Sequence, residues 1–157
     1  MREFELIQKW AEDRNLVKGS NPGAQMLKLY EEFGELTGAI AKQNQGVIID
    51  SIGDVVVVLG VMCAQLGVPL RKGPNMTMPT ELTTIVCRIG KEIGYLGDSL
   101  EDAKKHIPFI MGGVQFLAKT LELDFEKCVK SAYKEIKDRK GKMVDGVFVK
   151  EEDALAK

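Results

Sequence analysis

Two short groups of acidic residues carry the chemistry that this sequence suggests. Glu31, Glu32 and Glu35 lie in the segment YEEFGEL, and Asp50 and Asp54 follow in DSIGDVVVVL. At about 100° per residue, Asp50 and Asp54 fall on one face of a helix that is apolar on nearly every side. A buried carboxylate without a partner is unfavourable by several kcal/mol. These two side chains therefore require a cation, hydrogen bonds or protonation.

The first acidic group belongs to an amphipathic helix with an apolar stripe formed by Leu29, Phe33, Leu36 and Ile40. Glu32 and Glu35 lie beside this stripe, so they can face Asp50 and Asp54 if the two helices pack antiparallel. Four oxygen ligands without nearby Cys or His suit Mg²⁺ or Mn²⁺ rather than zinc. We therefore predict a metal site made by Glu32, Glu35, Asp50 and Asp54, of the kind that commonly serves phosphoryl chemistry.

Simpler interpretations of the acidic residues are open. A Glu-Glu-x-x-Glu string on a helix is usually a solvated face, and Asp50 can be the N-cap of the helix that follows it. Asp54 fits neither interpretation, because it comes one turn later in an apolar context. The presence of both acidic groups at this spacing favours the metal site.

Length and composition limit the possible classes of protein. The 157 residues suit a single domain, residues 1–157, and 45% hydrophobic but only 6% aromatic residues favour helices packed through aliphatic side chains. A net charge of −1 gives no general attraction for nucleic acid or an anionic membrane. Cys63, Cys87 and Cys128 are odd in number and widely spaced, which indicates free thiols in a reducing compartment.

The N-terminal segment MREFELIQKW is charged throughout and does not resemble a signal peptide. The longest apolar run, residues 55–64, is well short of the length of a membrane span. We therefore expect a cytoplasmic protein that binds neither a membrane nor nucleic acid.

Apolar periodicity predicts an all-α bundle of about five to six helices with a short C-terminal β-hairpin. The expected helices cover about residues 2–15, 24–43, 47–66, 82–104, 108–121 and 125–137. The valines of the third helix favour a strand, but this run is too long and lacks a period of two. Its nearly all-round apolar surface agrees with a core completed by oligomerisation.

The remaining elements are marked by Pro, Gly and Asp. Residues 67–79 contain Pro69, Pro74 and Pro79, and we expect a long connection there. Pro108 is expected to begin the fifth helix and Asp124 to cap the sixth. The tail KMVDGVFV predicts two short strands joined by Asp145 and Gly146.

One face of the last expected helix is basic. Its residues within an arc of about 80° are Lys127, Lys130, Lys134 and Lys137, and the face is extended by Arg139, Lys140 and Lys142. Two interpretations are open, a solvated basic face and a set of contacts to phosphate oxygens.

With these motifs the chain resembles the MazG-like members of the all-α NTP pyrophosphohydrolases, a superfamily that also contains dimeric dUTPases. The family pattern is E-E-x-x-E, a spacer, then E-x-x-D followed by G-D-V and a hydrophobic run. The matching segments are LKLYEEFGEL, Gly53-Asp54-Val55, QKWAEDRNL and DRKGKMVDGVFVKEED, and the resemblance covers almost the whole chain. One departure is Ser51, which stands where the pattern has Glu, and Asp50 offers a shorter carboxylate on the same helical face as Asp54.

The resemblance implies Mg²⁺-dependent hydrolysis of a nucleoside triphosphate to the monophosphate and pyrophosphate, in a homodimer or homotetramer. On this basis Glu31 or Glu35 is the candidate for accepting a proton from the attacking water. Residues expected to bind the substrate are Gln25, Lys28, Lys130, Lys134 and Arg139. The alternative is a non-catalytic helical module that senses nucleotide or metal, and Ser51 keeps this alternative open.

Other enzyme classes fit the sequence poorly. Di-iron helical bundles need Glu-x-x-His motifs, whereas His106 is the only histidine and has Ala103 three positions before it. The same scarcity argues against a His-dependent nucleophile, and we expect His106 at a helix end. The sequence has no G-x-x-x-x-G-K-[ST] loop, so a P-loop mechanism is unsupported.

Overall fold

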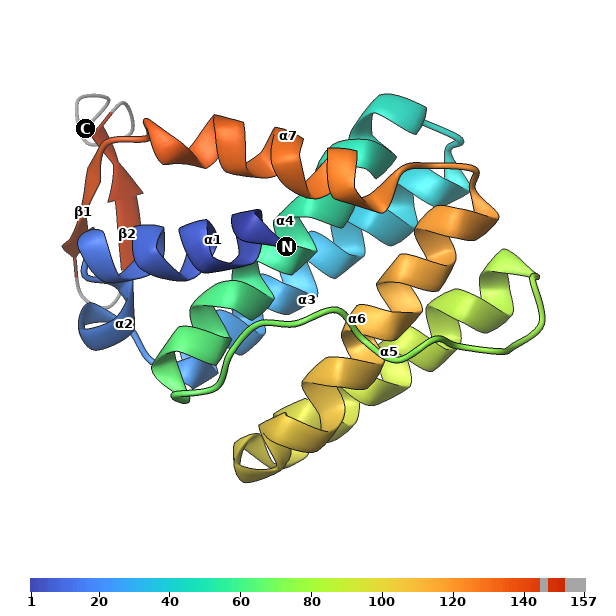
Figure 1. The fold of residues 1–157 in the computed structure, drawn as a ribbon, viewed down its shortest axis with the longest axis horizontal. Helices are drawn as coiled ribbons and strands as arrows, with labels where there is room; N and C mark the ends of the chain where they lie inside the picture. Colours follow the sequence, from blue (N-terminus) through green and yellow to red (C-terminus); the bar gives the residue numbers. More distant parts are fainter. Residues whose placement is uncertain (145–146, 152–157) are drawn as a thin grey trace.

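The computed structural model describes residues 1–144 and 147–151, except for the side chains of Lys142 and Val147. It confirms the all-α class with a short hairpin near the C-terminus (Figure 1). The α-helices are α1 (Arg2–Asp13), α2 (Leu16–Gly19), α3 (Pro22–Ala41), α4 (Gln45–Gln65), α5 (Leu82–Asp98), α6 (Ala103–Thr120) and α7 (Phe125–Lys137). A single 3₁₀ turn, Leu100–Asp102, lies between α5 and α6, and the strands are β1 (Gly141–Val144) and β2 (Val147–Lys150).

Side-chain caps fix the starts of three helices. Asn21 accepts a hydrogen bond from the Ala24 backbone N–H (2.9 Å) before α3, and Asn44 accepts one from Val47 N–H (3.3 Å) before α4. The interpretation of Asp50 as an N-cap is therefore wrong, because α4 begins a full turn earlier. Asp124 caps α7 as predicted, through Lys127 N–H (3.1 Å).

Helix α4 is the centre of the molecule. It packs against α1, α3 and α7, and α1 and α7 lie side by side across it in Figure 1. Its buried residues include nearly every position from Ser51 to Cys63. The helix is long and apolar enough to cross a membrane, but 72% of its most apolar stretch is buried inside this structure, as in the core helix of a soluble protein. Its burial needs no second copy of the chain.

Gly53 allows α7 to approach α4 closely. A Cβ at this position would lie 2.5 Å from the Ala132 Cβ and 2.7 Å from the Cys128 carbonyl oxygen. Any larger side chain must push the two helices apart. This contact matters for function, because the end of α7 contributes side chains to the pocket described below.

The boundary between the fourth and fifth expected helices was predicted wrongly. Helix α5 ends at Asp98 rather than near Lys104, and α6 begins at Ala103, so Pro108 lies inside α6. Tertiary contacts explain the earlier start, because Ala103 and His106 are buried and the His106 Nδ1 atom lies 2.8 Å from Glu92 Oε2 on α5. His106 thus lies in the first turn of α6, where it is buried.

The predicted connection and hairpin are both present. The chain runs without helix or strand from Val68 to the start of α5, and it is held to α1 because Gln8 Nε2 donates to the Val68 carbonyl (3.0 Å). Strands β1 and β2 pair antiparallel with Gly141 opposite Lys150. The predicted turn residues, Asp145 and Gly146, lie outside the described residues.

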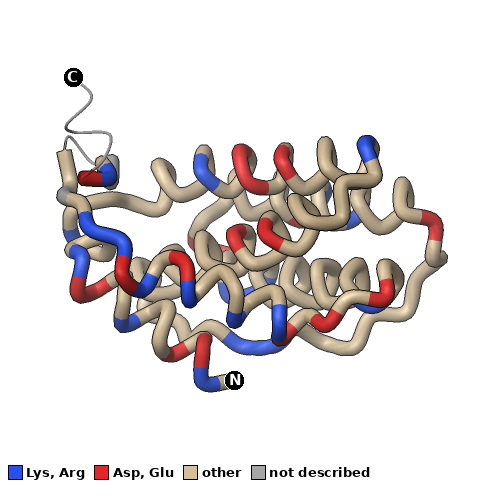
Figure 2. The backbone as a smooth tube through the Cα atoms, turned by 90° about the horizontal axis from the view of Figure 1, so that it is seen from above, with Lys and Arg blue, Asp and Glu red and all other residues tan. Residues whose placement is uncertain are grey.

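The hairpin lies beside the end of α1, next to α2 (Figure 1). Arg14 fixes this corner, since its guanidinium donates to the carbonyls of Arg139 (2.9 Å) and Lys137 (2.7 Å) at the end of α7. The expected first helix is shorter than predicted, because Asn15 adopts a left-handed conformation (φ 59°) that ends it. Figure 2 shows acidic and basic residues interspersed along the helices, which agrees with the small net charge.

Candidate functional site

A pocket of about 680 Å³ opens between α3, α4 and α7, with residues of α1, α2 and β2 completing its wall. This volume is typical of a small-molecule site. Of the residues predicted from the sequence, those that line it are Gln25, Lys28, Glu31, Glu32, Glu35, Asp54 and Arg139. The structure therefore brings most of the predicted site together in one place.

Glu32 and Asp54 enter this pocket from the two arms of a helical hairpin. Helices α3 and α4 are joined by a short turn and pack along each other, and both residues are equally distant in sequence from Gln43 in that turn. Glu32 is only 7% exposed, although it is charged. Asp54 is mostly buried among the valines of α4. The antiparallel packing expected from the sequence is thus what places the two carboxylates at the same level.

The electrostatics of Asp54 indicate a shortage of positive charge. Burial and, after it, the charges of Glu32 and Glu135 raise the pKa of the Asp54 carboxyl to about 7, against the opposing effect of Arg139. A cation placed beside Asp54 would restore its charged form. The donor set, carboxylate oxygens without a nearby Cys or His, fits a hard divalent ion such as Mg²⁺.

Lys28 forms ion pairs with two acidic residues of α3. Its Nζ lies 2.8 Å from Glu32 Oε1 and 2.9 Å from Glu31 Oε2. Since the Glu32 side chain is nearly buried, this ammonium is the main partner of its charge. Lys28 was expected to contact a substrate. In this structure it is instead paired with Glu32, a predicted metal ligand, and with Glu31, a predicted base.

The carboxylates are not gathered as tightly as a bound ion would require. Within residues 1–144 and 147–151, no three Asp, Glu, His or Cys side chains are close enough to hold one ion together. Mutual repulsion favours this separation, because the positive charges of Lys28, Arg139 and Lys150 face five acidic residues that line the pocket, Glu31, Glu32, Glu35, Asp54 and Glu135.

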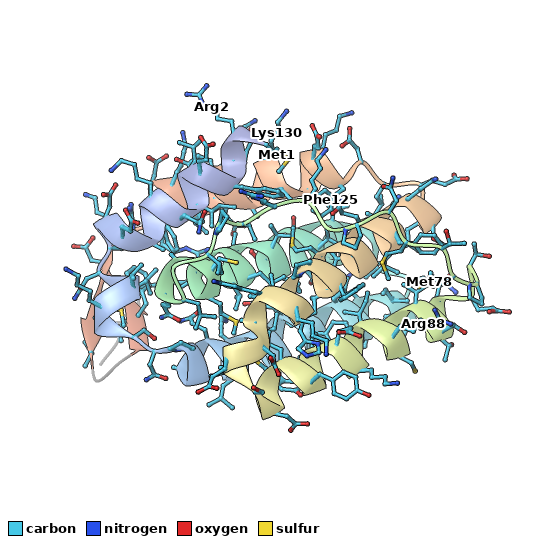
Figure 3. All side chains as sticks on the ribbon, turned by 60° about the horizontal axis from the view of Figure 1, so that its bottom comes forward. Met1, Arg2, Met78, Arg88, Phe125 and Lys130 are labelled. Atoms are coloured by element: carbon cyan, nitrogen blue, oxygen red, sulfur yellow. The ribbon has the colours of Figure 1, made fainter. Side chains whose placement is uncertain are left out.

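Three predicted residues lie outside the pocket. Asp50 is exposed one turn before Asp54, and it acts on Asp54 only as a weaker charge that raises its pKa. Lys130 and Lys134 are exposed on α7, and Figure 3 shows Lys130 at the same edge of the molecule as Arg2. Ser51 is buried (2% exposed) and also does not line the pocket.

Sequence reasoning missed several residues that line the pocket. Glu135 lies on α7, four residues before Arg139, which follows the end of the helix, and the two side chains approach to 3.6 Å (Glu135 Oε1 to Arg139 Nη2). The i, i+4 spacing to Arg139 was the available signal. Trp10, Phe148 and Lys150 come from α1 and β2, and no spacing in the sequence connects these segments to the acidic motifs.

Comparisons with known proteins give one partial match. No protein-family profile matches the chain, and no solved structure matches it. A stretch of 59 residues, 38% of the chain, is 54% identical to an uncharacterized 18.2 kDa protein in the rep-hol intergenic region of Haemophilus phage HP1 (strain HP1c1). The match spans 36% of that protein's length, and it establishes similarity to part of a phage protein without indicating an activity.

Proposed function

We propose that the protein is an Mg²⁺-dependent nucleoside triphosphate pyrophosphohydrolase, which converts an NTP or dNTP and water to the monophosphate and pyrophosphate. The observation that carries the proposal is the convergence of Glu32 and Asp54 on one pocket, opposite Arg139. The raised pKa of Asp54, to about 7, supports it, because this carboxylate needs a cation to be charged. The resemblance of the acidic motifs to those of MazG-like enzymes supplies the reaction.

In this proposal Glu32, Asp54 and Glu35 hold Mg²⁺, which Mn²⁺ can replace. When bound, the ion would neutralise the negative charge of the phosphates and lower the pKa of the attacking water. Glu31 and Glu35 are exposed at the pocket, and either carboxylate can accept the proton from this water. Glu135 and Asp50 add negative charge that strengthens the attraction for cations.

The positive side chains of the pocket have the complementary role. Arg139 stabilises the negative charge that develops on the leaving pyrophosphate. Lys28, which is paired with Glu32 in this structure, would contact a phosphate oxygen if Glu32 were bound to the ion instead. Gln25 lies one turn before Lys28 on the same wall. We assign no role in the pocket to Lys130 and Lys134.

We also propose that the protein works in the cytoplasm as a homodimer or homotetramer. Tyr30 on α3 is 49% exposed and Leu27, which borders the pocket, is 75% exposed, and a second copy of the chain would cover them. Light scattering on the purified protein tests this part, and a monomer at micromolar concentration would contradict it.

The proposed reaction is tested by incubating the purified protein with Mg²⁺ and a panel of canonical and modified nucleoside triphosphates. We expect equal amounts of monophosphate and pyrophosphate from at least one nucleotide, and no release of inorganic phosphate as the first product. Chelation of Mg²⁺ should stop the reaction.

The competing proposal is a module that binds nucleotide or metal without turnover. It is favoured by Ser51, because the family pattern has a carboxylate at this position and the Ser51 side chain is buried away from the pocket. Nucleotide binding detected by calorimetry, with no product from any member of the panel, would support the module and contradict the hydrolase.

A further inference from the structure

The pocket extends well beyond its acidic end. Along α4 the lining residues are Asp54, then Val57, Val58 and Val61, so the wall becomes apolar over about 10 Å. Helix α3 runs in the opposite direction and brings Gln25 to the level of Val61. The roles proposed above use the end near Asp54 and leave the apolar end without an occupant.

Trp10 forms part of the apolar end. Ile7, one turn before it on α1, contacts Gly60, and the Leu16 carbonyl accepts a hydrogen bond from Gln65 Nε2 (3.0 Å). Helix α1 therefore places Trp10 beside the second half of α4, away from Asp54. The ring is 7% exposed and lines the pocket.

The indole of Trp10 has an unused hydrogen-bond donor. Its Nε1 is buried and has no partner among the described residues, although nearly all buried polar groups in folded proteins have one. The Arg14 guanidinium lies over the indole ring at 5.4 Å, but it carries only hydrogen-bond donors and cannot accept from the Trp10 N–H. This donor belongs to a residue that lines the pocket, so an acceptor atom on a bound molecule would satisfy it.

The C-terminal hairpin supplies a second aromatic ring. Phe148 on β2 lies edge-on to Trp10, with ring centroids 6.3 Å apart and an angle of 62° between the planes. Both rings line the pocket, together with Leu16 and Val61. Aromatic and aliphatic walls with a few polar groups beside them are suited to a flat heterocycle rather than to a sugar or a phosphate.

We propose that Trp10 and Phe148 form the subsite for the base of the nucleotide, with the Trp10 N–H donating to a nitrogen or carbonyl oxygen of the base. This inference rests on the proposed function, which places the phosphates near Asp54. The hairpin then contributes to the choice of base, since Phe148 on β2 forms part of this wall.

The subsite can be observed directly, because Trp10 is the single tryptophan of the chain. The probes are the α,β-imido analogues of dATP, dCTP, dGTP and dUTP and, as a ligand without a base, inorganic tripolyphosphate, all with Mg²⁺. At least one nucleotide analogue should change the Trp10 fluorescence in a saturable manner, and tripolyphosphate should not. Nucleotide binding measured by calorimetry without any fluorescence change would overturn the subsite.

Substitutions test the same point through kinetics. Phe148→Ala should raise KM for the preferred nucleotide about tenfold, because stacking is lost, and leave the inhibition constant of tripolyphosphate unchanged. Trp10→Phe keeps an aromatic ring without the donor and should also raise KM. Phe109→Ala is the matched control, since Phe109 is 42% exposed on α6 and does not line the pocket.

The outcomes separate the two proposals. An unchanged KM in both Phe148→Ala and Trp10→Phe would overturn the subsite and leave the hydrolase standing. Equal weakening of nucleotide and tripolyphosphate would also overturn it, because the substitutions would then act on the whole pocket. Absence of both binding and pyrophosphate release in the unmodified protein would overturn the proposed function, and the subsite with it.

Discussion

Glu32 and Asp54 line the same pocket from adjacent helices, and Glu32 is the side chain whose charge contributes most, after burial itself, to the raised pKa of Asp54. The charge of Glu32 therefore destabilises the charged form of Asp54. Lys28 offsets the charge of Glu32 but is not a source of the Asp54 shift. This arrangement is the physical basis for proposing a divalent ion between α3 and α4.

Asp54→Asn and Asp50→Asn form a matched pair, because the residues lie one turn apart on α4 and only Asp54 lines the pocket. We expect Asp54→Asn to lower kcat/KM for nucleotide hydrolysis by at least about 100-fold, and Asp50→Asn to lower it by less than about fivefold. Circular dichroism should show an unchanged helix content in both. A larger loss in Asp50→Asn would show that the exposed carboxylate is the ligand.

Glu35→Gln tests the last of the three glutamates on α3. Glu35 lines the pocket and is exposed, so the substitution should leave the fold intact and abolish turnover, with a loss of at least about 100-fold. Glu101→Gln is the control, because Glu101 is exposed in the 3₁₀ turn away from the pocket. Full activity of Glu35→Gln in the pyrophosphate assay would remove Glu35 from the site.

The raised pKa of Asp54, about 7, predicts a particular pH dependence of stability. Between about pH 4 and 7 the folded protein keeps a proton on Asp54 that the unfolded chain has released, so stability falls as the pH rises through this range. After allowance for partial exposure, the loss is about 2 kcal/mol in the absence of metal. It should be complete above pH 7.

Urea unfolding in the presence of a chelator, at pH values from 4 to 8, measures this effect. The difference in unfolding free energy between the unmodified protein and Asp54→Asn isolates Asp54 from the other titrating groups. Asp54→Asn should gain stability relative to the unmodified protein as the pH rises. Parallel curves for the two proteins would contradict the assignment of a raised pKa to Asp54.

Lys28→Met should strengthen metal binding in the absence of nucleotide, because the ammonium competes with the ion for Glu31 and Glu32. We expect the dissociation constant for Mn²⁺, measured by calorimetry, to fall about two- to tenfold. Lys28→Arg retains the charge and should change it little. Weaker Mn²⁺ binding by Lys28→Met would show that Lys28 supports the metal site instead of competing with the ion.

Gly53→Ala should destabilise the protein by about 1–3 kcal/mol, since the new methyl group collides with Ala132 and the Cys128 carbonyl. Gly94→Ala is the matched control, because a Cβ added at Gly94, inside α5, would have no neighbouring atom within 4 Å, and this change should stabilise by about 0.5–1 kcal/mol. Urea unfolding gives both values. A neutral Gly53→Ala would show that α7 can move away from α4 at no cost.

The helices that build the acidic end could be predicted because their signals are local. Asn caps and apolar periodicity specify α3 and α4. The short turn between these helices then brings Glu32 opposite Asp54. The helical wheel also grouped Asp50 with Asp54. A helical wheel shows the direction of each side chain around the axis but not its position along the axis. The pocket ends before the turn that carries Asp50.

The rest of the site depends on contacts between distant segments. Trp10, Glu135 and Phe148 meet at the pocket because α1 and α7 pack across α4 and the hairpin folds against α1. No periodicity in a single sequence specifies such packing. The start of α6 was missed for the same reason, since buried contacts of Ala103 and His106 extend the helix ahead of Pro108.

A crystal of the protein soaked in Mn²⁺, with diffraction recorded at the manganese absorption edge, tests the central claim most directly. We predict an anomalous peak between α3 and α4, within coordination distance of carboxylate oxygens of both Glu32 and Asp54, with Lys28 displaced from Glu32. An anomalous map without a peak at these two residues, at Mn²⁺ concentrations well above the dissociation constant measured by calorimetry, would contradict the account.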